Sequence, residues 1–168
     1  MEHNYPDEYR RLQEYATRKR IDLLNRLGWG MDGLVYSTKQ SSAVKAHSKK
    51  ETFEKEQRVY QALAEHPEYD FAGFSVPRML ECHPELWIIE MQLVVPPFVV
   101  DFTGATIGKQ SSAFLDMSEE DYTEWRNEKI EAYGESDWEQ VEIVIRCFRR
   151  IGIYLNDVHK GNIRLRNE

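Results

Sequence analysis

Tyr154-Leu-Asn-Asp-Val-His-Lys-Gly-Asn-Ile-Arg-Leu-Arg-Asn-Glu168 is the stretch that decides how the remaining sequence is interpreted. Within it, Asp157 and Asn162 are five residues apart, and His159 lies between them. In a loop of this kind the carboxylate can accept a proton while the amide holds a metal ion. The D-x4-N spacing alone is a weak signal, because an Asp and an Asn occur at this separation in many loops. Its meaning therefore depends on whether the first half of the chain carries matching nucleotide-binding parts.

Length and composition limit the classes of protein that fit. A chain of 168 residues predicts one domain, or two small lobes that share a cleft. No apolar run approaches the roughly 18 residues needed to cross a bilayer, and the first twenty residues are too charged for a signal peptide. Cys82 and Cys147 lack a C-x-x-C spacing, so neither a metal cage nor a disulfide is expected. The sequence therefore predicts a cytoplasmic protein that does not act at a membrane.

The charge is negative overall and unevenly distributed. The net charge is -7, yet residues 1–50 carry ten Lys or Arg against six Asp or Glu. The acidic excess peaks between Glu119 and Glu142, a segment with ten acidic and two basic residues. Affinity for a phosphate backbone needs clustered positive charge, so a nucleic-acid partner is disfavoured. The acidic run predicts either a solvated helix face or a surface for a basic partner or substrate.

Three glycines in the first half indicate a nucleotide-binding turn. Gly28, Gly30 and Gly33 fit G-x-G-x-x-G, a pattern found in both Rossmann folds and kinases. A Rossmann fold would continue with a helix, whereas residues 34–37 and 42–46 predict two short strands. The glycines are therefore expected in a hairpin, where backbone N–H groups can come close to phosphates.

A strand with Lys45 is followed by a helix with two candidate carboxylates. Lys45 lies on the second of these strands, and residues 52–65 predict a helix with apolar residues on one side. Glu56 falls in the register of that side, whereas its rival Glu54 would project about 200° away around the helix. Of the two, Glu56 is therefore expected on the side of the helix that faces the sheet.

The segments around this helix predict an antiparallel sheet. Residues 7–26 have the pattern of an amphipathic helix that runs into a first strand. Residues 78–82 and 86–93 predict two further strands joined by a turn. Five strands with one helix are expected in this half of the chain.

The second half is predicted to be mostly helical. Ser118 and Asp121 form a variant of the capping box at the start of a helix that ends near Gly134. The next helix runs to Gly152 and is apolar over most of its circumference, so we expect it to be buried.

Together these motifs resemble the protein-kinase-like superfamily. Residues 28–35 fit the G-x-G-x-x-G-x-V loop, Ala43-Val44-Lys45 resembles V-A-I-K, and Ile88–Gln92 resembles the hinge. The loop at Asp157 is similar to H-G-D-x-H-P-G-N of the aminoglycoside and choline phosphotransferase branch, and to H-R-D-x-K-x-x-N of protein kinases. The resemblance implies an α+β fold: a five-stranded antiparallel N-lobe with one helix, and a reduced, mostly helical C-lobe that ends at the catalytic loop.

The resemblance also implies a division of the chain. Residues 1–20 would form a lead-in helix, 21–93 the nucleotide-binding N-lobe, and 94–168 the truncated C-lobe. The glycine hairpin and Asp157 would then face one nucleotide cleft.

The reaction that the resemblance implies is transfer of the γ-phosphoryl group of ATP, with Mg²⁺ as cofactor. Asp157 would deprotonate the acceptor hydroxyl, and Lys45, held by Glu56, would grip the phosphates. His159 or Lys160 would lie near the γ-phosphate, and Asn162 with Asp101 would bind Mg²⁺. The residues implied in nucleotide binding are Gly28, Gly30, Gly33, Val35, Ala43, Ile89, Glu90 and Gln92.

The sequence departs from the family pattern around the catalytic loop. Leu155 replaces the customary His, and Asn156 replaces Arg or Gly. In kinases the metal-binding Asp follows the loop Asn, whereas six residues follow Asn162 here. We expect residues 98–100 to pair as a strand with 163–165 and to deliver Asp101 beside Asn162. The alternative is that Asp101 only forms a turn at a strand end.

Three functions remain open from the sequence. One is an active minimal kinase that acts on a protein or small-molecule hydroxyl. Another is a nucleotide-binding pseudokinase that acts as a regulatory or interaction module. The last is a non-catalytic regulator of toxin–antitoxin or phage type that keeps only the fold, for which a homodimer would cover the truncated lobe.

Overall fold

The computed structural model describes residues 5–166 and divides into two compact units. The first unit contains the chain up to Tyr60 together with Pro77–Leu93, and the second contains Gln61–Val76 together with the chain from Val94 onward. Among the described residues, no helix has both the length and the apolar character that crossing a bilayer requires.

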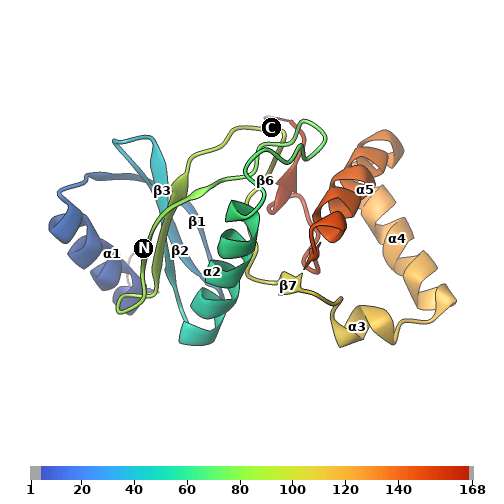
Figure 1. The fold of residues 1–168 in the computed structure, drawn as a ribbon, viewed down its shortest axis with the longest axis horizontal. Coiled ribbons are helices and arrows are strands. Elements are labelled where there is room, and N and C mark those ends of the chain that lie inside the picture. Colours follow the sequence, from blue (N-terminus) through green and yellow to red (C-terminus); the bar gives the residue numbers. More distant parts are fainter. Residues whose placement is uncertain (1–4, 167–168) are drawn as a thin grey trace. The chain divides into compact units, whose positions relative to one another are not determined.

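The first unit is built on an antiparallel five-stranded sheet (Figure 1). The strand order is β1-β2-β3-β5-β4, so β3 lies in the centre. The strands are β1 (Leu23–Gly30), β2 (Gly33–Thr38), β3 (Ser42–His47), β4 (Met79–His83) and β5 (Ile88–Gln92). With the helix that follows β3 and the helical second unit, this confirms the predicted α+β fold and its five-stranded sheet with one inserted helix.

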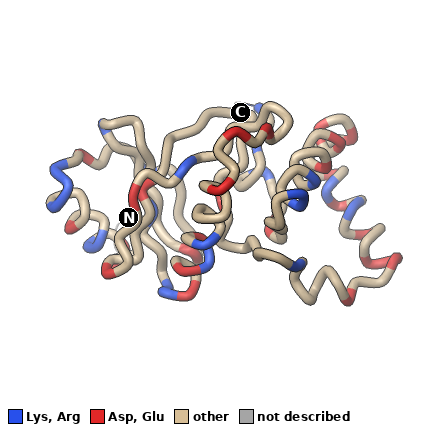
Figure 2. Tube along the Cα trace, in the orientation of Figure 1, with Lys and Arg blue, Asp and Glu red and all other residues tan. Residues whose placement is uncertain are grey.

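Helix α1 (Pro6–Lys19) covers one face of this sheet (Figure 1). Its buried residues Leu12 and Tyr15 pack with Val44 and Ala46 of β3, while its outer side carries charges of both signs (Figure 2). The helix ends at Arg20, whose left-handed φ of 57° turns the chain into β1. The predicted change from helix to strand is thus present.

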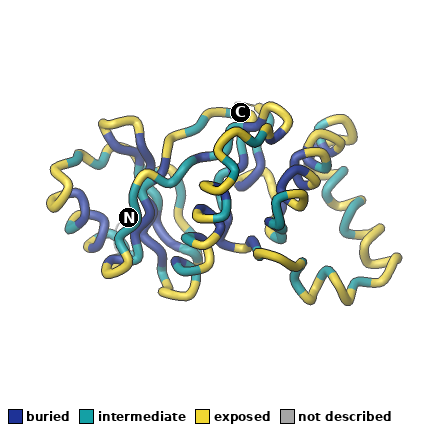
Figure 3. The backbone as a smooth tube through the Cα atoms, in the orientation of Figure 1, coloured by how far each residue is buried: buried dark blue, intermediate teal, exposed yellow. Residues whose placement is uncertain are grey.

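Helix α2 (Lys50–Ala64) covers the opposite face (Figure 1). Phe53 meets the His47 ring edge-on at 5.6 Å, and the Tyr60 hydroxyl lies 3.0 Å from the Met91 sulfur. Successive residues of a strand point to opposite faces, so β3 turns alternate side chains toward α1 and α2. All six residues of β3 are therefore buried (Figure 3).

The second unit combines three helices with two short strand pairs. Its elements are β6 (Phe98–Val99), β7 (Thr106–Ile107), α3 (Ser112–Leu115), α4 (Glu119–Tyr133), α5 (Glu135–Arg150), β8 (Ile153–Tyr154) and β9 (Ile163–Arg164). Strand β6 pairs with β9, and β7 pairs with β8, both antiparallel. The predicted pairing of residues 98–100 with 163–165 is confirmed, with Phe98 opposite Arg164 and Val99 opposite Ile163.

Helix α5 is amphipathic and not buried on all sides, which corrects the prediction. Trp138, Val141, Val144 and Phe148 are buried, but Ile143 is 43% exposed. Ile143 lies on the side that also carries charged residues, so the high apolar content overstated the width of the buried stripe. The buried side meets Phe71, whose ring centroid is 4.4 Å from that of Phe148.

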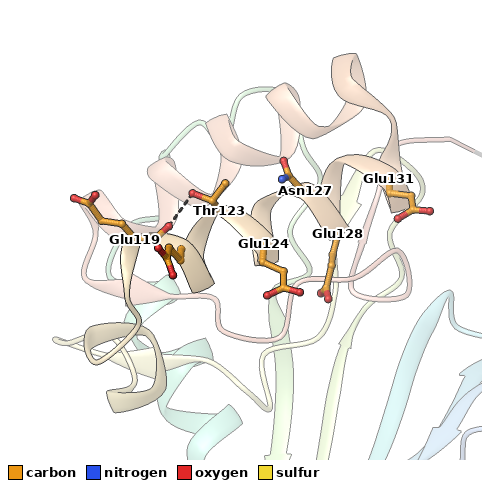
Figure 4. A pocket seen from close by; sticks show the side chains of 7 residues that line it. Glu119, Thr123, Glu124, Asn127, Glu128 and Glu131 are labelled. Carbon is orange, nitrogen blue, oxygen red and sulfur yellow. Dashed lines mark hydrogen bonds between the residues drawn. The ribbon is translucent and has the colours of Figure 1, made fainter.

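Helix α4 starts at the predicted capping box and is largely exposed. The Ser118 hydroxyl accepts from the Asp121 N–H, and the Asp121 carboxylate accepts from the Ser118 N–H. The helix stops at Gly134, where φ is 87°. Its outer side forms an open, acidic depression (Figure 4), lined by Glu119, Glu120, Thr123, Glu124, Asn127, Glu128 and Glu131. The α4 part of the acidic run is thus solvated, whereas Asp137 and Glu142 of α5 are 17% and 23% exposed and pair with Arg166 and Arg126. A basic partner stays a prediction.

Candidate functional site

The glycine hairpin joins β1 and β2, with Gly30 paired to Gly33. Gly33 has φ of 146°, and a Cβ there would lie 2.2 Å from the Ala46 carbonyl oxygen, so the fold itself requires glycine. A Cβ on Gly28 or Gly30 would meet nothing within 4 Å. Packing within the chain therefore does not require glycine at these two positions. Their backbone is open to close approach by other atoms.

Val35, Lys45 and Ile89 form one row across the sheet. Val35 is the partner of Lys45 on β2, and Ile89 is its partner on β5. Ala43 lies two residues before Lys45 on β3 and shares its face. The structure thus brings Val35, Ala43 and Ile89 onto the face that carries Lys45.

Glu90 and Gln92, in the segment that resembles a kinase hinge, form hydrogen bonds within the first unit. The Glu90 carboxylate accepts from the Tyr15 hydroxyl at 2.7 Å and from the Ser42 hydroxyl at 2.5 Å. The backbone N–H of Gln92 donates to the Arg78 carbonyl at 2.9 Å. In this arrangement the Gln92 N–H is used within the first unit, so binding of a base by this group stays a prediction.

Lys45 and Glu56 form a buried ion pair, 2.7 Å from Nζ to Oε2. Their side chains are 6% and 0% exposed. Glu54, the rival in sequence, is 45% exposed and pairs with Lys50 on its own helix at 3.2 Å. The expected choice of Glu56 over Glu54 is present in the structure, and its role in binding phosphates stays a prediction.

The Glu56 carboxyl is strongly biased toward its ionised form. Burial by itself would raise its pKa, but the Lys45 ammonium and the His47 ring 2.8 Å away outweigh burial and lower the pKa to about 2. The folded pKa therefore lies below that of the unfolded chain, so the ionised group stabilises the fold above pH 4.5. This stability is lost as the pH falls from 4.5 toward 2.

Glu56→Gln is expected to remove this acid-dependent part of the stability. The difference between the pKa of about 2 and the ordinary 4.5 corresponds to about 3 kcal/mol. The variant should unfold more easily at pH 7 but lose less on acidification, as measured by thermal unfolding between pH 7 and pH 2. Glu54→Gln, which removes an exposed carboxylate from the same helix, should follow the wild-type profile; parallel profiles for wild type and Glu56→Gln would contradict the assignment.

In the second unit, Asp157 and Asn162 are joined directly. The Asn162 amide nitrogen donates to the Asp157 backbone oxygen at 2.9 Å and to its carboxylate at 3.0 Å. The Asp157 side chain is 58% exposed, whereas Asn162 is buried. Because the amide nitrogen is directed at Asp157, the amide oxygen is left as the acceptor end. A buried amide thus fixes the orientation of an accessible carboxylate.

His159 lies beside the same carboxylate, with Nε2 3.4 Å from Asp157 Oδ2. Its other ring nitrogen, Nδ1, accepts from the Gly161 N–H at 3.0 Å. A nitrogen that accepts carries no proton, so in the neutral ring the proton is on Nε2 and faces Asp157. A Cβ on Gly161 would lie 2.8 Å from this ring, so the glycine permits the contact.

Asp101 lies at the same narrow crevice as Asp157 and Asn162. The Val100 N–H donates to the Asn162 carbonyl at 2.9 Å, which places Asp101 directly after the strand pair. Its carboxylate accepts from the Thr103 N–H at 2.9 Å, as in a turn. Within residues 5–166, no group of three or more His, Cys, Asp or Glu is arranged to hold a metal ion. Metal binding by Asp101 and Asn162 stays a prediction.

Three residues that support this site were missed in the sequence. A Cβ on Gly104 would lie 2.9 Å from the Asp157 Cβ, so Gly104 packs directly on the candidate base. Asn156 donates to the Gly104 carbonyl at 2.8 Å. The Tyr133 hydroxyl donates to the Ile163 carbonyl at 3.1 Å, and burial followed by the nearby Asp157 charge raises the pKa of Tyr133. Asn156, which departs from the kinase motif, thus holds the Gly104 segment in place through this hydrogen bond.

If Asp157 is the general base that the kinase resemblance implies, Gly104→Ala is expected to lower ATP turnover by displacing it. To reach an ordinary contact of 3.4 Å, the new Cβ and the Asp157 Cβ must move apart by about 0.5 Å. Misplacement by 1 Å can cost about 10²-fold in rate, so we expect a loss of about tenfold. ATP turnover should fall while the KM for ATP and the unfolding temperature stay near wild type. Unchanged turnover would show that Gly104 does not position Asp157.

Comparison with solved structures finds a distant match. It is the aminoglycoside phosphotransferase APH(2″)-IIa, in a ternary complex with streptomycin and ATP; the sequences are 13% identical and the TM-score is 0.40. The match covers 66% of this chain and 33% of that protein, so the chain spans about a third of its length. No family model and no curated protein matches the sequence.

Proposed function

We propose that the protein is an ATP-dependent phosphotransferase of minimal kinase-like fold, which moves the γ-phosphoryl group to a hydroxyl acceptor. The observation that carries the proposal is the buried pair of Lys45 and Glu56. Removing two opposite charges from water is costly, and apolar residues of similar size stabilise a fold as well or better. A Lys–Glu pair buried between β3 and α2 is therefore best explained by a charge that serves a ligand.

The first unit supplies the features that a nucleotide needs. The Lys45 ammonium would neutralise phosphate charge, and the open backbone at Gly28 and Gly30 would let N–H groups approach the phosphates. Val35, Ala43 and Ile89 share the face of Lys45, but Ala43 and Ile89 are 5% and 0% exposed, so Val35 is the residue of the three that would offer an apolar surface to the adenine ring.

The second unit supplies the features that an acceptor hydroxyl needs. Asp157 is accessible and is held by Asn162, so its carboxylate can orient the hydroxyl and take its proton. The Nε2 proton of neutral His159 points to the same carboxylate and could also be donated to a phosphate oxygen.

The residues present fit a magnesium ion bound together with a nucleotide. Mg²⁺ is commonly held by one or two carboxylate-type ligands, with phosphates and water completing its shell. The acceptor end of the Asn162 amide and the Asp101 carboxylate would be the protein ligands. When bound, the ion would neutralise phosphate charge.

A second candidate is a nucleotide-binding module without turnover. It is favoured by the Asp101 carboxylate, one oxygen of which already accepts the Thr103 N–H. If that oxygen stays in the turn, metal binding is weakened while nucleotide binding by the first unit is unaffected. The two candidates thus differ in the response to Mg²⁺.

A thermal-shift titration with ATP, with and without Mg²⁺, together with an assay of ATP turnover, tests the proposal. A ligand at 100 times its Kd stabilises the folded state by about 2.7 kcal/mol, a readily measured shift. We expect stabilisation that increases with Mg²⁺ and turnover that needs Asp157. Stabilisation without turnover would support the second candidate, and no stabilisation under either condition would refute nucleotide binding.

A further inference from the structure

His47 is a fully buried histidine to which the sequence motifs assign no role. It lies two residues after Lys45 on β3, so its side chain points to the same face, toward α2. Its Nε2 is 2.8 Å from Oε2 of Glu56, the same oxygen that Lys45 contacts at 2.7 Å. Its Nδ1 is 3.1 Å from the Trp87 carbonyl oxygen.

Both partners of the His47 ring can only accept hydrogen bonds. The Trp87 group is a carbonyl, and the Glu56 group is a carboxylate whose pKa lies far below neutrality. A neutral imidazole has one donor and one acceptor nitrogen, so a neutral ring would direct a lone pair at one of these oxygens. In a fully buried site that repulsion and the missing hydrogen bond are costly. A ring with both nitrogens protonated satisfies both contacts.

The surroundings contain other charges, on three elements. Glu56 comes from α2, and Lys45 comes from β3 itself. Arg11 of α1 donates to the His47 carbonyl at 2.7 Å, on the other side of the sheet. Of these groups, the Glu56 carboxylate makes direct contact with the ring, and its charge favours the imidazolium.

We propose that His47 is a buried imidazolium that anchors Glu56 independently of Lys45, and is thus a positioning residue that keeps α2 on the sheet. Glu56 receives two charge-assisted hydrogen bonds from one strand, either of which ties the helix to it. Loss of the Lys45 contact therefore leaves α2 in place. Only the consequence for catalysis rests on the proposed function: Lys45 can turn toward a phosphate without releasing Glu56.

The protonation state is tested by NMR of the histidine ring nitrogens in the wild-type protein at pH 7. We expect both nitrogens of His47 to show the shifts of protonated nitrogen. The signal is assigned by its loss in His47→Gln. One bare nitrogen on His47 would overturn the proposal.

The anchoring role is tested by amide hydrogen exchange across α2, without nucleotide. Lys45→Met and His47→Phe should each leave exchange in α2 near the wild-type rate, whereas the double variant Lys45→Met/His47→Phe should accelerate it about tenfold or more, the effect of losing both charge-assisted hydrogen bonds. Lys45→Met/His47→Gln, in which Gln can still donate one N–H to Glu56, should keep most of the protection. Full acceleration in Lys45→Met alone, or none in the double variant, would refute an independent anchor.

These experiments separate the anchor from the enzymatic proposal. If His47→Phe does not fold, His47→Gln and the wild-type spectrum still decide the matter. A protein that never binds ATP would give the same exchange and NMR results, so failure of the proposed function leaves the anchor standing. Conversely, a neutral His47 would refute the anchor while ATP turnover could persist.

Discussion

Replacing Asp157 by Asn is expected to lower ATP turnover by about 10²- to 10⁴-fold, the usual contribution of a positioned general base. The amide keeps the size of the carboxylate but cannot take the proton of the acceptor hydroxyl. Asp157 is 58% exposed, so the substitution should leave the fold and its unfolding temperature nearly unchanged. The measurement is steady-state turnover of ATP with Mg²⁺, and the affinity for ATP should stay within a few-fold of wild type.

A matched control is Asp116→Asn, which changes an exposed aspartate of the same unit that ends α3. It removes the same charge away from the candidate site and should retain full turnover. If Asp157→Asn retained turnover as well, Asp157 would not be the base, and the residual activity would have to come from another group.

Lys45→Met is expected to weaken ATP binding by about 10- to 100-fold. An interaction with a charged partner contributes about 1.5–3 kcal/mol, and a methionine of similar length cannot supply it. Glu56 would keep His47 as a partner, so the fold should survive the substitution. Titration calorimetry with ATP measures the affinity, and thermal unfolding without ligand reports the stability.

Lys39→Met is the control for loss of a lysine from the first unit. Lys39 is 72% exposed and its ammonium lies 4.0 Å from the Asp22 carboxylate, so its removal should change neither affinity nor stability. Equal affinities of wild type and Lys45→Met would show that ATP, if bound, is held without this ammonium group. The buried Lys45–Glu56 pair would then no longer support the phosphotransferase proposal.

The sequence predicted the features that depend on local periodicity. The choice of Glu56 over Glu54 followed from helical geometry, which places the two carboxylates on different sides of α2. The glycine hairpin followed from the strands on both sides of it, and the capping box of α4 from the spacing of Ser118 and Asp121. The distant pairing of β6 with β9 could also be predicted, because the hypothesis of a shared metal site placed Asp101 near Asn162.

The features that were missed depend on contacts between distant segments. Asn156 and Gly104 are 52 residues apart, and no periodic pattern links them. His47 gains its partners only when α2 and the turn before β5 close over β3. Strands β7 and β8 have two residues each, too few to show an alternation of apolar and polar residues. For α5, the high apolar content wrongly predicted burial on all sides, because Ile143 is exposed.

The docking of α1 has a practical consequence for anyone who wishes to trim the protein. The helix buries Leu12 and Tyr15 against Val44, Ala46 and Ile88, so its removal would uncover an apolar sheet face. Surfaces of that kind promote aggregation. Shortened versions that begin at the first strand are thus expected to be insoluble, and crystallisation or screening work should retain the whole of Pro6–Lys19.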